Sequence, residues 1–148
     1  MKRIVFLFLI SIFLFSCKRH EKIFIYSMDK KNCITIITED TIRYLIVGKS
    51  SGHIPDTNFV SLNINKIDEL GDCLWICWLA NNSWDITINK SEVIENKLDT
   101  LKYQFKTKLP VSQFGIPNEL PYRRTNCAIF DFYTKRLSPQ KGAIVEIN

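Results

Sequence analysis

The sequence has few of the residues and motifs from which common active sites are built. Only two of its 148 residues are histidines, His20 and His53, and His20 lies near the start of the chain, so a histidine base would have to be His53. The Gly-x-Ser-x-Gly motif of α/β hydrolases is absent. Gly48-Lys49-Ser50 ends like a phosphate-binding loop, but Arg43 stands where that loop needs its first glycine. The sequence therefore excludes a P-loop and argues against a hydrolase.

Metal-binding and nucleic-acid-binding patterns are also missing. Zinc sites use closely spaced ligand pairs such as Cys-x-x-Cys, whereas Cys73 and Cys77 are separated by three residues. The chain has 20 basic and 15 acidic residues, and the basic ones are dispersed. Only Lys102, Lys106 and Lys108 approach the dense stripe that nucleic acids require. We expect no metal, no cofactor and no nucleic-acid partner.

Long helical periodicity is absent as well. Apolar and polar residues alternate with period two over most of the chain, with many β-branched and aromatic residues, which is typical of strands. The alternation predicts strands over residues 23–27, 33–38, 42–48, 58–64, 73–79, 84–88, 101–106, 126–133 and 143–147. Leu101, Tyr103 and Phe105 give the clearest half-buried pattern. We expect residues 23–148 to form one small all-β domain, an antiparallel sandwich or barrel of about eight to ten short strands.

The segment 73–79 is apolar on both faces, which predicts a central strand, and the turn that follows it predicts a hairpin with residues 84–88. Trp75 and Trp78 should point to opposite faces, so at most one of them shares a face with Trp84. Large rings usually pack in a core. A ring exposed on a concave face would instead contact a ligand, and Trp84 is our candidate.

The start of the chain is predicted to be an export signal. Lys2 and Arg3 precede an apolar run over residues 4–15, and the run ends at Ser16 and Cys17. A helix needs about 20 residues to cross the hydrocarbon core of a bilayer, and this run has only about a dozen. The segment is therefore too short to cross the hydrocarbon core as a permanent transmembrane helix.

Leu14-Phe15-Ser16-Cys17 resembles the lipobox of bacterial lipoproteins, although Phe15 is bulkier than the usual residue. The resemblance implies that residues 1–16 are removed, that Cys17 carries a diacylglycerol, and that residues 17–22 form a lipidated tether. Two or three acyl chains hold a protein on a bilayer almost irreversibly. By the same resemblance, Lys18 directly after Cys17 favours the outer membrane, with either face open.

Four further cysteines follow: Cys33, Cys73, Cys77 and Cys127. An even number in an oxidising compartment favours disulfide bonds, and four cysteines allow three connectivities. In a strand, Cys73 and Cys77 would lie about 13 Å apart, beyond the Cα separation of about 7 Å that a disulfide tolerates. Each is therefore expected to bond to Cys33 or Cys127, or to stay reduced in the core.

Two segments are predicted to be surface loops. Residues 48–56 form the longest run of turn-forming residues and include His53. Residues 109–124 contain three prolines and end in Tyr122, Arg123 and Arg124. Tyrosine and arginine are enriched at binding hot spots, so we take these three residues, with His53 and Trp84, as candidate contacts.

Together these patterns predict a non-catalytic domain on an outer-membrane lipoprotein. We expect it to bind an envelope or secreted protein, as an inhibitor, an immunity-type protein or an accessory subunit, by edge-strand addition or through its loops. The alternative is a carbohydrate-binding or hydrolytic envelope protein that uses the His53 loop or an exposed tryptophan. A cleft that joins His53 to a carboxylate would favour the alternative.

Overall fold

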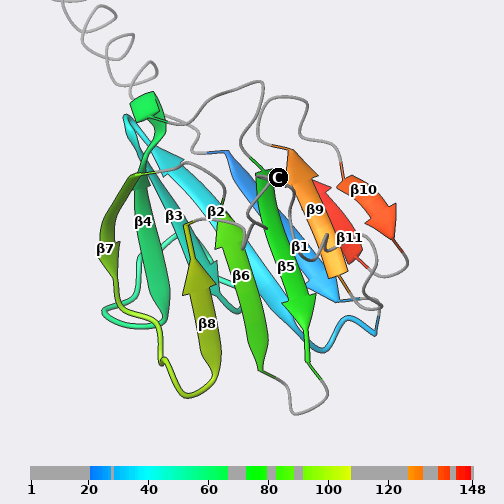
Figure 1. The fold of residues 1–148 in the computed structure, drawn as a ribbon. Helices are drawn as coiled ribbons and strands as arrows, with labels where there is room; N and C mark the ends of the chain where they lie inside the picture. The colour runs from blue at the N-terminus through cyan, green and yellow to red at the C-terminus, as the bar shows by residue number, and fades with distance from the viewer. Residues whose placement is uncertain are drawn as a thin grey trace, which may run out of the picture.

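A computed structural model describes residues 21–27, 29–66, 73–79, 83–88, 92–107 and 127–131, and the backbone of 137–140 and 143–147. These residues contain eleven strands and one 3-10 turn, η1 (Ile64–Lys66). The strands form two sheets that face each other (Figure 1). The predicted all-β fold is confirmed, and the sandwich, not the barrel, is the arrangement that forms.

The first sheet is antiparallel throughout and has the strand order β11-β1-β2-β3-β4-β7. Its strands are β1 (Lys22–Ser27), β2 (Cys33–Glu39), β3 (Ile42–Val47), β4 (Phe59–Asn63), β7 (Glu92–Asn96) and β11 (Ala143–Ile147). Short connections join β1 to β2 and β2 to β3, between strands that the alternation predicts.

The second sheet has the order β10-β9-β5-β6-β8. Its strands are β5 (Cys73–Trp78), β6 (Trp84–Ile88), β8 (Tyr103–Lys106), β9 (Cys127–Asp131) and β10 (Leu137–Gln140). β5 is central and pairs with β6 as a hairpin, as predicted. β8 runs parallel to β6, in contrast to the expected all-antiparallel pairing. The chain crosses from the first sheet to the second between β7 and β8, and a strand that arrives by a crossover is free to pair in parallel.

The core lies between the sheets and consists of their inward-facing aliphatic and aromatic side chains. It includes Ile25, Ile34, Ile36, Leu45, Leu62, Leu74, Ile76, Ile86, Ile88 and Phe130, all of them buried. Burial of each such side chain contributes about 1.5–3 kcal/mol. The period-two pattern therefore specifies which face of each strand turns inward.

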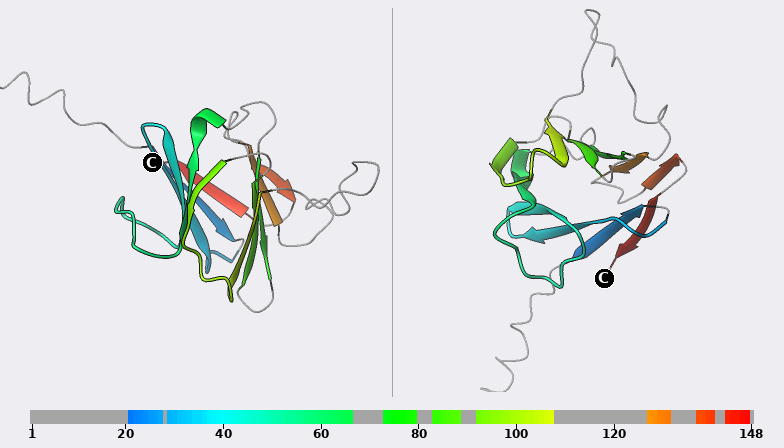
Figure 2. Two further views of the ribbon diagram at one scale, coloured as in Figure 1. Left: turned by 60° about the vertical axis from the view of Figure 1, so that its left-hand side comes forward. Right: turned by 90° about the horizontal axis from the view of Figure 1, so that it is seen from below.

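The first sheet also buries its outer face, because residues 48–58 fold back over it. We call this segment, which joins β3 to β4, the strap. Figure 2 shows it outside the first sheet, on the side away from the second sheet. The outer face beneath it is largely apolar and buried; it carries Phe24, Tyr26, Cys33, Thr35, Ile37, Ile46 and Phe59.

Specific contacts hold the strap in place. The hydroxyl of Thr35 donates to the carbonyl oxygen of Gly48 at 2.6 Å and accepts from the N–H of Ser50 at 2.9 Å. The ammonium of Lys49 lies 5.2 Å from the ring centre of Phe24. Ile54 packs against the apolar side chains of the outer face. The loop predicted over residues 48–56 is therefore held by these contacts against the outer face of the first sheet.

The start of β8 differs from the prediction. β8 begins at Tyr103, and Leu101 is 93% exposed instead of facing the core. The carboxylate of Asp99 accepts from the N–H of Leu101 at 3.0 Å, and the carbonyl oxygen of Asp99 accepts from Lys102 and Tyr103. Strand β8 begins only after this turn, because the hydrogen bonds of the turn take the place of hydrogen bonds in the sheet.

Several predicted features lie outside the described residues: the export signal over 1–16, the tether residues 17–20 with Cys17, and the loop over 109–124. Within the described part, no helix is long and apolar enough to cross a bilayer.

Candidate interaction surface

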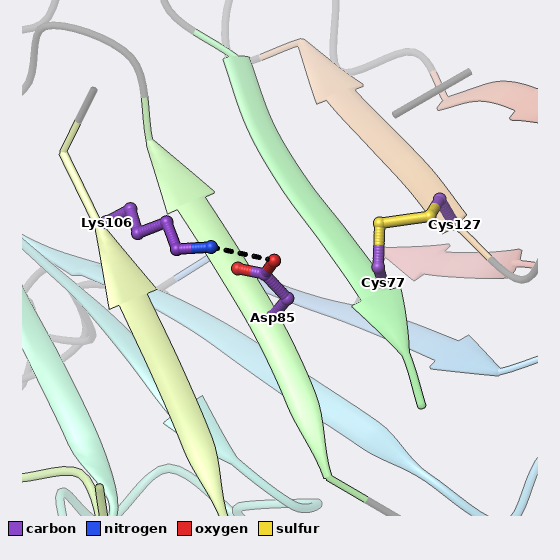
Figure 3. The surroundings of a disulfide bond; sticks show 4 residues. All are labelled: Cys77, Asp85, Lys106 and Cys127. Atoms are coloured by element: carbon purple, nitrogen blue, oxygen red, sulfur yellow. Dashed lines mark hydrogen bonds and ion pairs between the residues drawn. A yellow bond between two sulfur atoms is a disulfide. The ribbon is translucent and has the colours of Figure 1, made fainter. Parts of the chain in front are cut away.

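The second sheet carries a disulfide bond on its outer face. Cys77 on β5 and Cys127 on β9 are direct register partners, with Cα atoms 4.1 Å apart and an S–S bond of 2.09 Å (Figure 3). Their neighbours Ile76 and Ala128 face the core, so both sulfur atoms lie on the opposite face. The disulfide that the sequence leaves open therefore joins Cys77 to Cys127.

Cys33 and Cys73, the other two candidates for a disulfide bond, remain thiols, which is the alternative that the sequence leaves open. Cys33 lies on the outer face of the first sheet and Cys73 on the outer face of the second. Two packed sheets are about 10 Å apart, and each of these outer faces lies beyond that layer. The core therefore keeps the two sulfur atoms apart.

An ion pair lies beside the disulfide on the same face. Lys106 on β8 donates to the Oδ2 atom of Asp85 on β6 at 3.0 Å, and Asp85 is the register partner of Cys77 (Figure 3). The side chain of Asp85 is 12% exposed and that of Lys106 is 40% exposed. Partial burial strengthens such a pair relative to a fully solvated one. The pair links the parallel strands β6 and β8, and the carboxylate of Asp85 is bound to the ammonium of Lys106.

Trp84 is not a surface contact, so this prediction is wrong. Its side chain is 2% exposed, and its ring packs edge-on against those of Trp78 at 5.4 Å and Tyr103 at 6.5 Å between centroids. Trp78 shares the core face with Trp84, and Trp75 points to the other face, as alternation predicts. A ring of this size stabilises the fold more when it is buried in the core than it would stabilise a complex when exposed to a ligand.

His53 lies on the strap and is exposed. The hydroxyl of Ser50 donates to the carbonyl oxygen of His53 at 2.6 Å, so this hydroxyl is directed at the backbone and not at the imidazole ring. A serine nucleophile would need to donate to the imidazole nitrogen. In the part of the chain that the structure describes, no group of three His, Cys, Asp or Glu residues could hold a metal ion.

Three large apolar side chains are exposed among the described residues: Leu79, Ile94 and Leu101, with exposed fractions of 41%, 54% and 93%. Leu79 follows β5, Ile94 lies on β7, and Leu101 lies in the turn between β7 and β8. The N–H of Trp84 donates to the carbonyl oxygen of Lys102, which places the β5–β6 hairpin next to that turn. We call Leu79, Ile94 and the turn residues 97–102 the distal surface.

The turn residues of the distal surface lie at the end of the sandwich opposite the start of β1. Lys22 begins β1 at one end, whereas Cys33 begins β2 at the other. Gly48 donates to the carbonyl oxygen of Cys33, and Asn58 donates to that of Lys97, so these residues lie together at the second end. Figure 1 shows the β7–β8 turn at the end away from η1 and from the start of β1. Lys22 and the β7–β8 turn therefore lie at opposite ends of the sandwich.

The edge strand β7 itself is protected against simple strand addition. Its pairing with β4 changes register between Ser61 and Leu62. Its charges are paired, with Lys66 at 3.6 Å from Glu92 and Lys97 at 3.0 Å from Glu95. Bulges and charges are the usual means by which exposed edges resist pairing. The geometry therefore favours binding through side chains of the distal surface over strand addition at β7.

Comparison with known proteins finds no relative: no family model matches the chain, and neither a curated protein nor a solved structure matches it.

Of the predicted contacts, Trp84 is in the core and His53 is exposed. Tyr122, Arg123 and Arg124 lie outside the described residues. The sequence gives no signal for Ile94 as a surface contact. For Leu101 it does give one, since Asp99 is a common turn former.

Proposed function

We propose that this chain is an outer-membrane lipoprotein, anchored through Cys17, whose non-catalytic β-domain binds an envelope or secreted protein through the distal surface. The observation that carries the proposal is the exposure of Leu79 and Leu101 at the end of the sandwich away from Lys22 and of Ile94 on the edge strand β7. A lipid at one end leaves the other end available to a partner.

The chemistry of the distal surface suits a protein partner. An interface typically has an apolar centre and a polar rim. Here the sequence neighbours of Ile94 and Leu101 include exposed charged residues, among them Glu95, Lys97 and Lys102. Complete burial of one leucine side chain contributes about 1.5–3 kcal/mol to association. A partner with a matching apolar patch would therefore gain affinity at this end.

The rigidity of the scaffold also supports a binding role. The Cys77–Cys127 bond joins β5 to β9, and the Lys106–Asp85 pair joins β8 to β6. A surface held in its bound shape loses little conformational entropy on association. This property fits an inhibitor, an immunity-type protein or an accessory subunit. The alternative of a carbohydrate binder or hydrolase has less support, because Trp84 is buried and Ser50 is directed away from the imidazole of His53.

Position-specific photocrosslinking tests the proposal. A photoreactive residue is introduced at position 94, 101 or 41 of the full chain, in membranes of the cells that produce it. Thr41 is the control, because it is exposed in the β2–β3 turn at the tether end. We expect positions 94 and 101 to give the same single protein adduct and position 41 to give none. Equal adducts at all three positions, or none at 94 and 101, would reject the distal surface.

The identified partner then allows a quantitative test with purified proteins. Leu101→Asp should weaken binding by at least about tenfold, which corresponds to about 1.4 kcal/mol, whereas Thr41→Asp should leave the affinity unchanged. The anchor is tested separately by the mass of the N-terminal peptide. A free thiol at Cys17 in the native protein would reject the lipoprotein part of the proposal.

A further inference from the structure

The start of β1 is joined to the tip of the strap. The ammonium of Lys22 donates to the carbonyl oxygen of Ser51. Gly52 lies so close that a Cβ atom added to it would be 2.6 Å from the Nζ atom of Lys22, and its φ of +120° is itself favourable only for glycine. We call Lys22, Ser51, Gly52 and His53 the anchor corner.

The length of the tether restricts where this corner can be. Cys17 and Lys22 are five residues apart, and a fully extended chain spans at most about 3.6 Å per residue, or about 18 Å in all. If Cys17 is acylated, as proposed above, the Lys22 backbone lies within that distance of the lipid. Because Lys22 also holds Ser51, the strap tip stays close to the point at which the domain begins.

The exposed groups at and beside this corner match phosphate headgroups. Ser51, Gly52 and His53 are exposed and carry no acidic side chain, and exposed Lys49 precedes them on the strap. The acidic residues near the corner are exposed Glu21, directly before Lys22, and Asp56 on the strap. Each lysine or arginine near an anionic bilayer contributes about 1 kcal/mol of attraction. Lys18 and Arg19, which lie between Cys17 and Lys22 in the sequence, add two positive charges.

We infer that the strap tip lies against the phosphate headgroups of the bilayer in which Cys17 is anchored. The strap then has two roles: it covers the outer face of the first sheet, and it sets the orientation of the domain. β1 is six residues long and spans about 20 Å at about 3.3 Å per residue. The turn residues of the distal surface, which lie beyond the far end of β1, are thereby directed away from the headgroups and toward a partner. This inference rests on the proposed lipid anchor.

Fluorescence quenching on vesicles tests the orientation. The mature lipoprotein, with Cys73→Ser to remove the partly exposed thiol, is reconstituted in phosphatidylcholine vesicles with or without phosphatidylglycerol. A fluorophore is attached at His53→Cys in one sample and at Thr100→Cys in the other, and the lipid headgroups carry a quencher. We expect loss of fluorescence at position 53, greater with phosphatidylglycerol, and no loss at position 100. Equal loss at both positions, or loss only at 100, would overturn the inference.

Two further samples separate this inference from the anchor proposal. Lys22→Met removes the bond to Ser51 and should reduce the quenching at position 53, while the fold, followed by circular dichroism, persists. The mass of the Cys17 peptide is measured in the same preparation. If that thiol is unmodified, the anchor proposal fails, and the orientation is measured on protein coupled through Cys17 to a maleimide lipid. Absence of quenching at position 53 in the coupled protein would overturn the strap inference alone.

Discussion

Cys77 and Cys127 face each other directly across the central strand pair of the second sheet, with a Cα separation of 4.1 Å. The two residues are 50 positions apart in the sequence. Their disulfide bond therefore closes a long loop that includes β6, β7 and β8. A cross-link of this kind restricts the unfolded chain much more than the folded one.

Loss of this disulfide should destabilise the domain strongly. We expect Cys77→Ala with Cys127→Ala to lower the free energy of unfolding by about 2–4 kcal/mol, measured by urea denaturation under non-reducing conditions. Cys73→Ala is the matched control, because Cys73 is a thiol on the same face, and it should change the free energy by less than about 1 kcal/mol. Equal losses in both variants would show that the bond contributes little.

The buried tryptophan of β6 gives a second prediction. The ring of Trp84 packs against two other aromatic rings and is 2% exposed. Trp84→Ala should therefore cost about 3–5 kcal/mol of unfolding free energy, and Trp84→Phe clearly less. Trp75→Ala, on the half-buried outer face, is the comparison. A smaller cost for Trp84→Ala than for Trp75→Ala would contradict the assignment of Trp84 to the core.

The sequence predicts most strands of this fold but not all of them. Period-two alternation of apolar and polar residues identifies β6 and β8, whose apolar side chains face the core. The alternation does not predict β7, because its residues Glu92–Asn96 are mostly exposed and burial imposes no alternation on them. β10 contains Pro139, which is compatible only with an edge strand. Local patterns do not reveal which strands lie at an edge.

The candidate site was harder to predict, because it depends on which strands become neighbours. Spacing alone excludes a Cys73–Cys77 bond, but the choice of Cys127 as the partner requires the order β9-β5. The exposure of Leu101 depends on the turn at Asp99, which competes with the alternation that follows it. Similarly, the strap is recognisable as a loop from its turn formers, whereas its contact with Lys22 is formed between distant residues.

Asn58 gives a test of backbone conformation at the end of the strap. Its φ is 61°, its N–H donates to the carbonyl oxygen of Lys97, and the N–H of Lys97 donates to that of Phe59. This is a bulge in which the first residue is left-handed, a conformation that glycine adopts freely and alanine does not. Asn58→Ala should lower the unfolding free energy by about 1 kcal/mol. Asn58→Gly should be close to neutral, and the reverse order of the two variants would rule out this bulge.

The turn between β1 and β2 gives a prediction about pH. The hydroxyl of Ser27 donates to Asp29 at 2.7 Å, and the N–H of Lys31 donates to the same carboxylate oxygen at 3.1 Å. These bonds, the first above all, lower the pKa of Asp29 below its ordinary value of 3.8. A lowered folded-state pKa gives stability that is present above the unfolded value and is lost as the pH falls through the folded one.

Titration of Asp29 by NMR of its carboxyl carbon should therefore give a midpoint below 3.8 in the folded protein. Ser27→Ala should move that midpoint upward, because it removes the strongest donor to the charged form. The turn should loosen only in acid below that value. A midpoint that stays the same in Ser27→Ala would show that the hydroxyl is not the cause.

Thr35 provides the most direct test of the strap as a fixed cover. Its side chain is fully buried, and its hydroxyl serves both the carbonyl oxygen of Gly48 and the N–H of Ser50. Thr35→Val keeps the shape but leaves those two backbone groups without this partner, which should cost about 1–3 kcal/mol. Because the loss falls on the strap, hydrogen exchange of the Ser50 amide should accelerate more than exchange in the core strands. Thr57→Val, at an exposed strap position, should leave the exchange unchanged. Faster exchange in both variants, or in neither, would mean that the strap is not held through Thr35.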